Sequence, residues 1–255
     1  MLSEMVIYAF MKQTMQNFSG SLIKGVLNAI YPPRCLNCNA ALGLFNNEIL
    51  CGICYGKIRL NRAPFCKRCG RSSAVEGDSC SHCATHKYNF DRAYSACIYE
   101  GVIRECIHKF KYNSSLQARG LFYGLMSDFA QRYLDMINFD LIIPIPLHRV
   151  KLRQRTFNQS KILAKNISDR FGIPLLENNL IKTRFGKPQI KLQYSQRFKE
   201  IKDSFKMLRP FKVKDKACLL IDDVFTTGAT ANECSRVLRG AGASKVIVFT
   251  LANGI

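Results

Sequence analysis

The stretch that decides the fold lies near the C-terminus and reads LLIDDVFTTGAT from residue 219 to residue 230. Three apolar residues lead into two adjacent carboxylates, Asp222 and Asp223, and a run of small residues follows. Apolar residues then recur at helical spacing from Cys234 to Ala241. The pattern predicts a buried strand, a tight loop and a helix.

The composition of this loop suits a phosphate group. Small residues let backbone N–H groups approach a phosphate closely, the following helix directs its positive dipole end to the same place, and threonine hydroxyls add donors. Asp222 and Asp223 can accept hydrogen bonds from ribose hydroxyls or lie near Mg²⁺. The stretch is neither a Walker loop nor a dinucleotide-binding turn, because it lacks their glycine and lysine spacing. A paired acid followed by Thr-Thr-Gly-x-Thr resembles the phosphoribosyl pyrophosphate (PRPP) motif of type I phosphoribosyltransferases, and the alternative is an acidic strand end before an ordinary helix.

The charge balance points to a polyanionic partner. The chain of 255 residues carries 38 Lys and Arg against 18 acidic residues, a formal net charge of +20. Nucleic acid, a phosphorylated metabolite or an anionic membrane surface would suit this excess, and a well-solvated basic surface is the alternative. The early apolar run at 5–11 is too short to cross a membrane and lacks the flanks of a signal peptide, so we expect a cytoplasmic protein without a transmembrane segment.

Cysteine pairs dominate the N-terminal third. An extension with an amphipathic helix is expected over residues 1–30, followed by a cysteine-rich module over 31–88. Four Cys-x-x-Cys knuckles supply eight thiolates, which suits two closed, structural, tetrahedral Zn²⁺ sites. Sequential pairing of the knuckles is the simplest arrangement, and crossed pairing is possible. The predicted ligands are Cys35, Cys38, Cys51 and Cys54 for one ion and Cys66, Cys69, Cys80 and Cys83 for the other.

Residues 89–255 are expected to form an α/β domain with a parallel sheet and helices on both faces. Strand and helix patterns alternate from Asp140 onward, which favours right-handed crossovers. The segment 147–159 is predicted as a basic loop, and part of 184–216 as a mobile loop. Four further cysteines stand alone in apolar patterns and are expected in the core. The expected strands are 91–99, 140–146, 178–183, 219–224 and 245–251, and the expected helices include 101–112 and 116–134.

These pieces together resemble the ComF family of phosphoribosyltransferase-like competence proteins, from Tyr31 onward. The resemblance rests on several motifs besides that at 219–230: the Pro-Pro-Arg-Cys start and cysteine knuckles at 32–83, Phe110-Lys111-Tyr112, Pro144-Ile145-Pro146-Leu147, Arg155-Thr156-Phe157-Asn158-Gln159, and Gln189, Leu192 and Arg197. The family usually carries Gly where this chain has Thr156, and commonly Asn where it has Glu200.

The resemblance implies a type I phosphoribosyltransferase-like fold behind a double zinc ribbon. It implies that Asp222 and Asp223 contact ribose hydroxyls, and that Thr226, Thr227, Gly228, Ala229 and Thr230 hold the 5′-phosphate. It places Leu147, His148 and Arg149 near the pyrophosphate, bridged by Mg²⁺. It also implies handling of single-stranded DNA in natural transformation, with DNA-uptake machinery at the inner face of the membrane as a further partner.

Three hypotheses about function remain open. The first is a DNA-handling protein that binds PRPP or a related compound together with single-stranded DNA. The second is an active phosphoribosyltransferase with an unknown acceptor, and the third is a PRPP-sensing regulator. No general base is assigned, and aromatic residues among the basic ones would either stack on bases or anchor the loops. The residues expected to contact nucleic acid or a flexible loop are Lys151, Arg153, Arg155, Lys182, Arg184, Lys187 and Arg197.

Overall fold

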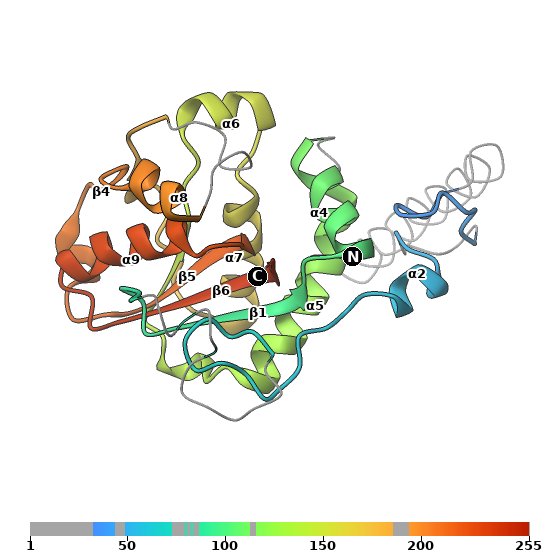
Figure 1. Cartoon of the computed structure of the whole chain (residues 1–255), viewed down its shortest axis with the longest axis horizontal. Coiled ribbons are helices and arrows are strands. Elements are labelled where there is room, and N and C mark those ends of the chain that lie inside the picture. The colour runs from blue at the N-terminus through green and yellow to red at the C-terminus, as the bar shows by residue number, and fades with distance from the viewer. Residues whose placement is uncertain are drawn as a thin grey trace, which may run out of the picture. The chain divides into compact units, whose positions relative to one another are not determined.

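The computed structural model describes residues 33–43, 49–72, 80, 83, 87–112, 116–185 and 194–254 (Figure 1). The chain divides into two compact units, one ending at Lys57 and the other running from Ile58 to Ile255. The predicted amphipathic helix within residues 1–30 lies outside the described residues. The predicted domain boundary at 88/89 remains a prediction, while the larger compact unit already includes the second pair of cysteine knuckles.

The unit that ends at Lys57 is built around the first two knuckles. Its described part contains an antiparallel bridge between Arg34 and Ala41 and the short helix α2 (Gly52–Gly56). Cys35 and Cys54 are buried, whereas Cys38 is exposed and Cys51 is intermediate. Among the described residues of this unit, the buried apolar side chains are few, and a bound metal would add to their stabilisation.

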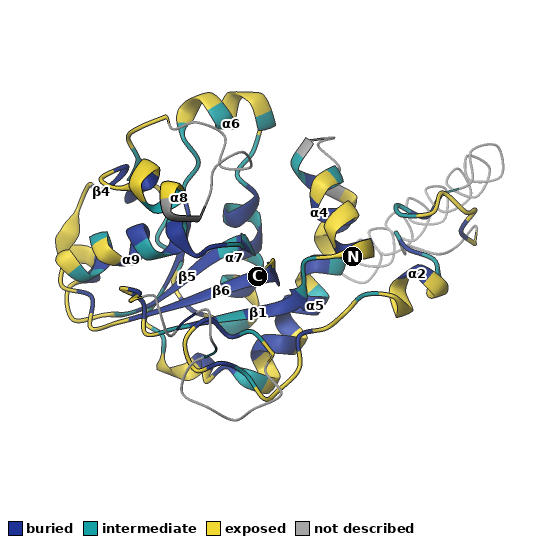
Figure 2. Ribbon diagram, in the orientation of Figure 1, coloured by how far each residue is buried: buried dark blue, intermediate teal, exposed yellow. Residues whose placement is uncertain are grey.

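The larger unit contains a four-stranded parallel sheet in the order β1-β6-β5-β2 (Figure 1). The two central strands are almost continuously buried, as Figure 2 shows. Such runs are expected where helices cover both faces of a parallel sheet. The strands are β1 (Arg92–Ile98), β6 (Lys245–Asn253), β5 (Ala217–Phe225) and β2 (Leu141–Pro144).

Helices pack against both faces of this sheet. On one face lie α5 (Arg119–Tyr133) and α7 (Gln159–Phe171), and the ring of Phe129 on α5 stacks on Phe249 of β6 at 5.8 Å. On the other face, α9 (Ala229–Gly240) shares a hydrophobic cluster with Leu220 of β5. The predicted fold class, a phosphoribosyltransferase-like α/β sheet preceded by a cysteine-rich module, is confirmed.

Two predicted helices match helices of the structure closely. The helix predicted over 101–112 is α4 (Gly101–Tyr112), and that predicted over 116–134 is a short 3₁₀ turn, Leu116–Ala118, followed by α5. The four single cysteines are buried as expected. Burial raises the pKa of Cys97 and of Cys218 to about 12 and that of Cys234 well above its usual value, so these thiols are core residues rather than nucleophiles.

Two segments predicted as loops contain regular structure. Residues 147–159 include helix α6 (Arg149–Arg155), whose first turn is capped by the side chain of His148. The segment 184–216 includes α8 (Tyr194–Ile201), β4 (Phe205–Met207) and a 3₁₀ turn, Pro210–Val213. Because charged residues are frequent in these short elements, their apolar faces give no clear periodic pattern in the sequence. Residues 186–193 lie outside the described residues.

The parallel alternation expected from Asp140 onward is wrong at one point. Strand β3 (Leu180–Lys182) does not join the main sheet but pairs antiparallel with β4 in a separate two-stranded sheet. Among the described residues, no helix is long and apolar enough to span a membrane.

Candidate functional site

The acid pair lies near the C-terminal end of β5, where two helices supply its partners. Asp222 Oδ1 accepts a hydrogen bond from Ser160 Oγ at 2.7 Å, and Ser160 lies in the first turn of α7. Asp223 Oδ1 accepts from Lys111 Nζ at 2.8 Å, and Lys111 lies in the last turn of α4. Segments from three regions of the chain therefore meet at these two carboxylates.

The Lys111–Asp223 ion pair is largely buried, with side chains 17% and 11% exposed. Burial lowers the pKa of Lys111, but the charge and hydrogen bond of Asp223 outweigh it, so this pKa lies above its usual value and the amine stays charged. Burial, followed by repulsion from Asp223, raises the pKa of Asp222 to about 7. Lys111 was not predicted as a site residue, although its Phe-Lys-Tyr motif was a signal for it.

The loop after β5 makes a left-handed turn at Gly228, where φ is +75°. A Cβ at Gly228 would lie 2.6 Å from the Phe225 ring and 3.1 Å from the Tyr88 ring, so only glycine fits without a shift. Thr227 Oγ1 accepts a hydrogen bond from Ala229 N at 3.3 Å, and α9 begins at Ala229. The predicted phosphate residues 226–230 thus form the turn and the N-terminus of a helix, an arrangement suited to an anion.

Strand β2 runs parallel to β5 and ends at the same edge of the sheet. Asn158 Nδ2 donates to the carbonyl of Ile145 at 3.0 Å, and Asn158 Oδ1 caps α7 at Ser160 N. The predicted pyrophosphate residues Leu147, His148 and Arg149 follow directly and lead into α6. Asn158 therefore ties this loop to the helix whose Ser160 contacts the acid pair.

The predicted nucleic-acid residues differ in burial and charge environment. Burial, followed by repulsion from Lys151, lowers the pKa of Lys182, while Asp222 is among the charges that oppose this shift. Arg153 and Arg184 are exposed, Arg155 and Arg197 are partly buried, and Lys187 lies outside the described residues.

The aromatic residues among these charges differ in burial. Phe157 packs against Phe110 at a ring distance of 5.3 Å, and Phe198 lies 6.4 Å from the Tyr88 ring, so both act as anchors. Phe185 is 52% exposed and lies 5.2 Å from the ring of His148. The side chain of Tyr194 lies outside the described residues.

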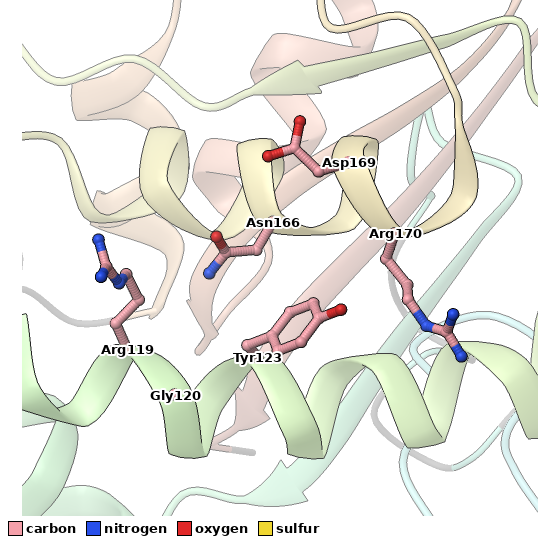
Figure 3. A pocket seen from close by; sticks show the side chains of 6 residues that line it. All are labelled: Arg119, Gly120, Tyr123, Asn166, Asp169 and Arg170. Atoms are coloured by element: carbon pink, nitrogen blue, oxygen red, sulfur yellow. The ribbon is translucent and has the colours of Figure 1, made fainter. Parts of the chain in front are cut away.

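A hollow of about 480 Å³ lies elsewhere, between α5 and α7 (Figure 3). Its lining on α7 begins at Asn166 and reaches Arg170, whereas the acid pair contacts Ser160 at the N-terminus of the same helix. Figure 3 shows Arg119, Tyr123 and Asn166 facing the space between the helices. No sequence motif pointed to this hollow, and it is separate from the acid pair.

The cysteines form two groups with the predicted sequential pairing. The four sulfurs of each group lie within 4.8 Å of one another, and the separations are 3.8 Å for Cys38–Cys51 and 3.7 Å for Cys69–Cys80. Sulfurs bound to one tetrahedral zinc at about 2.3 Å would lie about 3.8 Å apart, so both groups fit the ion.

The electrostatic environment of the thiols also suits a divalent cation. Although burial opposes it, hydrogen bonds from backbone amides lower the pKa of Cys35 and of Cys66 to about 6. In the second group, burial and the charges of neighbouring thiolates raise the pKa of Cys69 to about 12 and that of Cys83 further. A cation that binds all four sulfurs removes this repulsion.

The second cysteine group is bonded directly to the sheet. Asn61 Nδ2 donates to the carbonyls of Gly70 at 2.8 Å and Ser95 at 2.9 Å, and Asn61 Oδ1 accepts from Ser72 N at 3.0 Å. Asn253 Nδ2 donates to the carbonyl of Cys69 at 3.4 Å. The knuckle at Cys66 and Cys69 is therefore attached to strands β1 and β6.

Comparison with known proteins agrees with these features. The double zinc ribbon domain family matches residues 26–84. Competence protein F of Haemophilus influenzae is 27% identical over 224 residues, which cover 86% of this chain and 96% of the relative. The resemblance to the ComF family is confirmed. The DNA utilization protein YhgH of Salmonella typhimurium is 26% identical with the same coverage, and competence protein ComFC of Bacillus subtilis is 26% identical over 80% of this chain and 84% of its own.

Two solved structures overlap about half of this chain at low structural similarity. Glutamine PRPP amidotransferase from B. subtilis has a TM-score of 0.35 and 24% identity, over 51% of this chain and 26% of its own. Purine phosphoribosyltransferase from Pyrococcus horikoshii has a TM-score of 0.33 and 18% identity, over 53% of this chain and 72% of its own.

Proposed function

We propose that this protein binds PRPP or a related phosphoribosyl compound with Mg²⁺ and handles single-stranded DNA in natural transformation. The observation that carries the proposal is the acid pair Asp222–Asp223, held by Ser160 and Lys111 directly before the left-handed turn at Gly228. A ribose, a phosphate and a cation each find a suitable partner within this short stretch.

Different residues would contact different parts of the ligand. Carboxylates at 222 and 223 accept hydrogen bonds from ribose hydroxyls, and the turn at 226–230 donates backbone N–H groups to the 5′-phosphate. The loop at 147–149, which follows β2 in the chain, would contact the pyrophosphate. Lys111 already balances the charge of Asp223, so the site is prepared for an oxygen-rich ligand without accumulating negative charge.

Mg²⁺ fits this donor set. The ion takes oxygen ligands, keeps several waters, and is usually held by one or two carboxylates and the phosphates of the substrate. Asp222 is the better-placed carboxylate, because Asp223 Oδ1 is paired with the charged Lys111, whereas the bonds accepted by Asp222 Oδ1 come from the neutral groups Ser160 Oγ and Asp223 N. The bound ion would supply charge neutralisation for the pyrophosphate.

Handling of DNA is supported by the relatives and by the charges. The similar proteins are named for competence and for DNA utilization. Helix α6 presents exposed cations such as Arg149 and Arg153 beside the loop after β2. Phosphate contacts from such side chains are sequence-independent and salt-sensitive, which suits a protein that tracks a single strand of any sequence.

A titration with PRPP and Mg²⁺, with pyrophosphate release followed in the same samples, tests the ligand. Binding without release is expected, whereas release with an added acceptor would identify an active phosphoribosyltransferase instead. The double variant Asp223→Asn/Lys111→Met preserves the local charge balance and is expected to weaken binding by about 100-fold, equivalent to about 2.7 kcal/mol. Asp128→Asn, an exposed acid on α5, is the matched control. Normal binding by the double variant would refute the site.

A second titration with an oligothymidine strand tests the nucleic-acid surface. Lys151→Gln/Arg153→Gln is expected to weaken binding and to reduce the salt slope by about two, since each lost phosphate contact removes roughly one unit. Lys245→Gln, an exposed cation at the start of β6, is the control. An unchanged slope would exclude α6 from the DNA path.

A further inference from the structure

The chain that leaves the second cysteine group packs against the phosphate loop. Tyr88 is 9% exposed, and its hydroxyl donates to the carbonyl of Thr227 at 3.3 Å. Its ring stacks on Phe90 at 4.6 Å and meets the ring of Phe225 edge-on at 6.5 Å. Tyr88 is thus in contact with the loop through both its hydroxyl and its ring.

Two neighbouring features reinforce this contact. The Tyr88 ring lies so close to Gly228 that a Cβ there would approach it to 3.1 Å. Asn89 donates to Asn232 Oδ1 twice, from its backbone N at 2.7 Å and from its side-chain Nδ2 at 3.0 Å. Asn232 lies in the first turn of α9, so residues 88 and 89 hold both the loop and the start of the helix.

The same segment is continuous with the cysteine group on its other side. Cys83 precedes Tyr88 by five positions in the chain. Cys66, Cys69 and Cys83 belong to one hydrophobic cluster with Tyr88 and Phe90, and this cluster also contains Phe225 and Ala229 at the phosphate loop. Close-packed interiors transmit displacements between neighbours, so the metal group and the loop share one packed support.

We propose that Tyr88 and Asn89 are positioning residues for the phosphate loop, so that metal in the second cysteine group, but not in the first, sets the geometry of the ligand site. The first group lies in the separate unit that ends at Lys57. The expected effect on ligand affinity rests on the proposed binding of a phosphoribosyl compound. The expected effect on the conformational order of the phosphate loop is independent of that proposal.

The physical reason lies in the loop's backbone. An anion site built from N–H groups requires several peptide units to keep one orientation. Gly228 is the least restrained residue type at the centre of such a turn, and small neighbours add little packing of their own. The buried ring of Tyr88 and the two bonds to Asn232 supply the restraint that the loop lacks.

A matched pair of cysteine variants tests the metal's part. Cys80 and Cys51 are the third ligands of their groups, and both have intermediate exposure. Zinc content and amide hydrogen exchange at residues 226–232 would be measured for Cys80→Ser and Cys51→Ser. Both variants are expected to lose about one zinc per chain, but only Cys80→Ser should accelerate exchange at these residues, by about tenfold or more. Equal exchange in the two variants would overturn the proposal.

Variants that leave the cysteines intact keep the test valid if Cys80→Ser fails to fold. Asn232→Ala removes the acceptor of both Asn89 bonds, and Tyr88→Leu removes the ring and hydroxyl. Both are expected to retain two zinc ions, to accelerate exchange at 226–232 by about tenfold, and to weaken PRPP binding by a similar factor. Asn166→Ala, a partly buried asparagine on α7, is the control.

The outcomes separate the two proposals. Exchange within twofold of wild type in both Asn232→Ala and Tyr88→Leu would refute the positioning role, whatever PRPP does. Absence of PRPP binding by the wild-type protein would refute the proposed ligand, yet accelerated exchange in the variants would still establish the coupling between residues 88–89 and the loop.

Discussion

The two cysteine groups have the same four ligands and similar sulfur separations, but different surroundings. In the first group, Cys38 is exposed and the contacts described are local, such as Asn37 Nδ2 donating to Cys54 Sγ at 3.3 Å. In the second group, Cys66 and Cys69 are 1% and 0% exposed and belong to the core that supports the sheet. The same zinc motif therefore serves one unit as its own centre and another as part of a larger core.

This difference shows that the metal site alone does not determine what the metal stabilises. A zinc knuckle closes its own loop wherever it occurs. Side chains outside the motif decide which other parts of the protein depend on the metal. Here these are Asn61 and Asn253, which bond the second knuckle to β1 and β6. Four experiments would break or sharpen this contrast.

Zinc removal has the largest expected effect. During stepwise chelation, the ion of the first group should leave first, because Cys38 is exposed and Cys51 has intermediate exposure. The second ion should leave only as the sheet unfolds, since structural zinc contributes about 10–16 kcal/mol of binding free energy in modules that fold with it. A metallochromic indicator and far-UV circular dichroism would follow release and folding together. Cys38→Ser should remove the early phase, and simultaneous release of both ions would contradict the contrast.

Substitution of glycine by alanine should give the second-largest difference between the two groups. At Gly70, φ is +67° and an added Cβ would lie 2.1 Å from the Ala93 carbonyl oxygen, so Gly70→Ala should lower the free energy of unfolding by on the order of 3 kcal/mol. At Gly56, in the first unit, no atom of the described residues lies within 4 Å of an added Cβ. Gly56→Ala should therefore be neutral or slightly stabilising in urea denaturation. Similar losses from both variants would show that the second knuckle does not depend on close contact with β1.

Substitution of one asparagine beside each cysteine group should give a smaller difference in the free energy of unfolding. Asn61 is 2% exposed and joins Gly70, Ser72 and Ser95, so Asn61→Ala should cost about 2–3 kcal/mol by leaving buried backbone groups unsatisfied. Asn37→Ala removes one bond to a cysteine sulfur and should cost about 1 kcal/mol or less. Guanidinium denaturation monitored on the sheet provides the comparison. Equal costs would mean that the anchoring of the second group is weaker than its hydrogen bonds indicate.

The smallest effect tests the backbone argument at a position outside both groups. Thr156 has a φ of +65°, a left-handed conformation that favours Gly. Thr156→Gly should stabilise the fold by up to about 1 kcal/mol, because relief of the left-handed strain exceeds the added chain entropy. Thr156→Ala keeps the Cβ and should show no gain. If Ala stabilises as much as Gly, strain is not the cause, and the argument for Gly70 loses support.

Much of this molecule could be predicted because its signals are local. The run LLIDDVFTTGAT combines a buried strand, a turn and a helix start within one window, and the spacing of the knuckles indicates zinc, with sequential pairing as the simplest arrangement. The structure decided between sequential and crossed pairing. The predictions failed at α6, α8 and the β3–β4 pair. In those segments charged residues dominate, the elements are short, and their conformation depends on packing against parts of the chain that are distant in sequence.

Sequence by itself determined the zinc ligands, the acid pair and most of the strands and helices along the chain, because each depends on residues close together in the chain. Tertiary structure alone decided which groups meet. It brought Lys111 to Asp223, Ser160 to Asp222 and Tyr88 to the phosphate loop, contacts that span 112, 62 and 139 positions. Such contacts leave no periodic trace in the sequence, since they arise where strands distant in the chain end at one edge of a sheet.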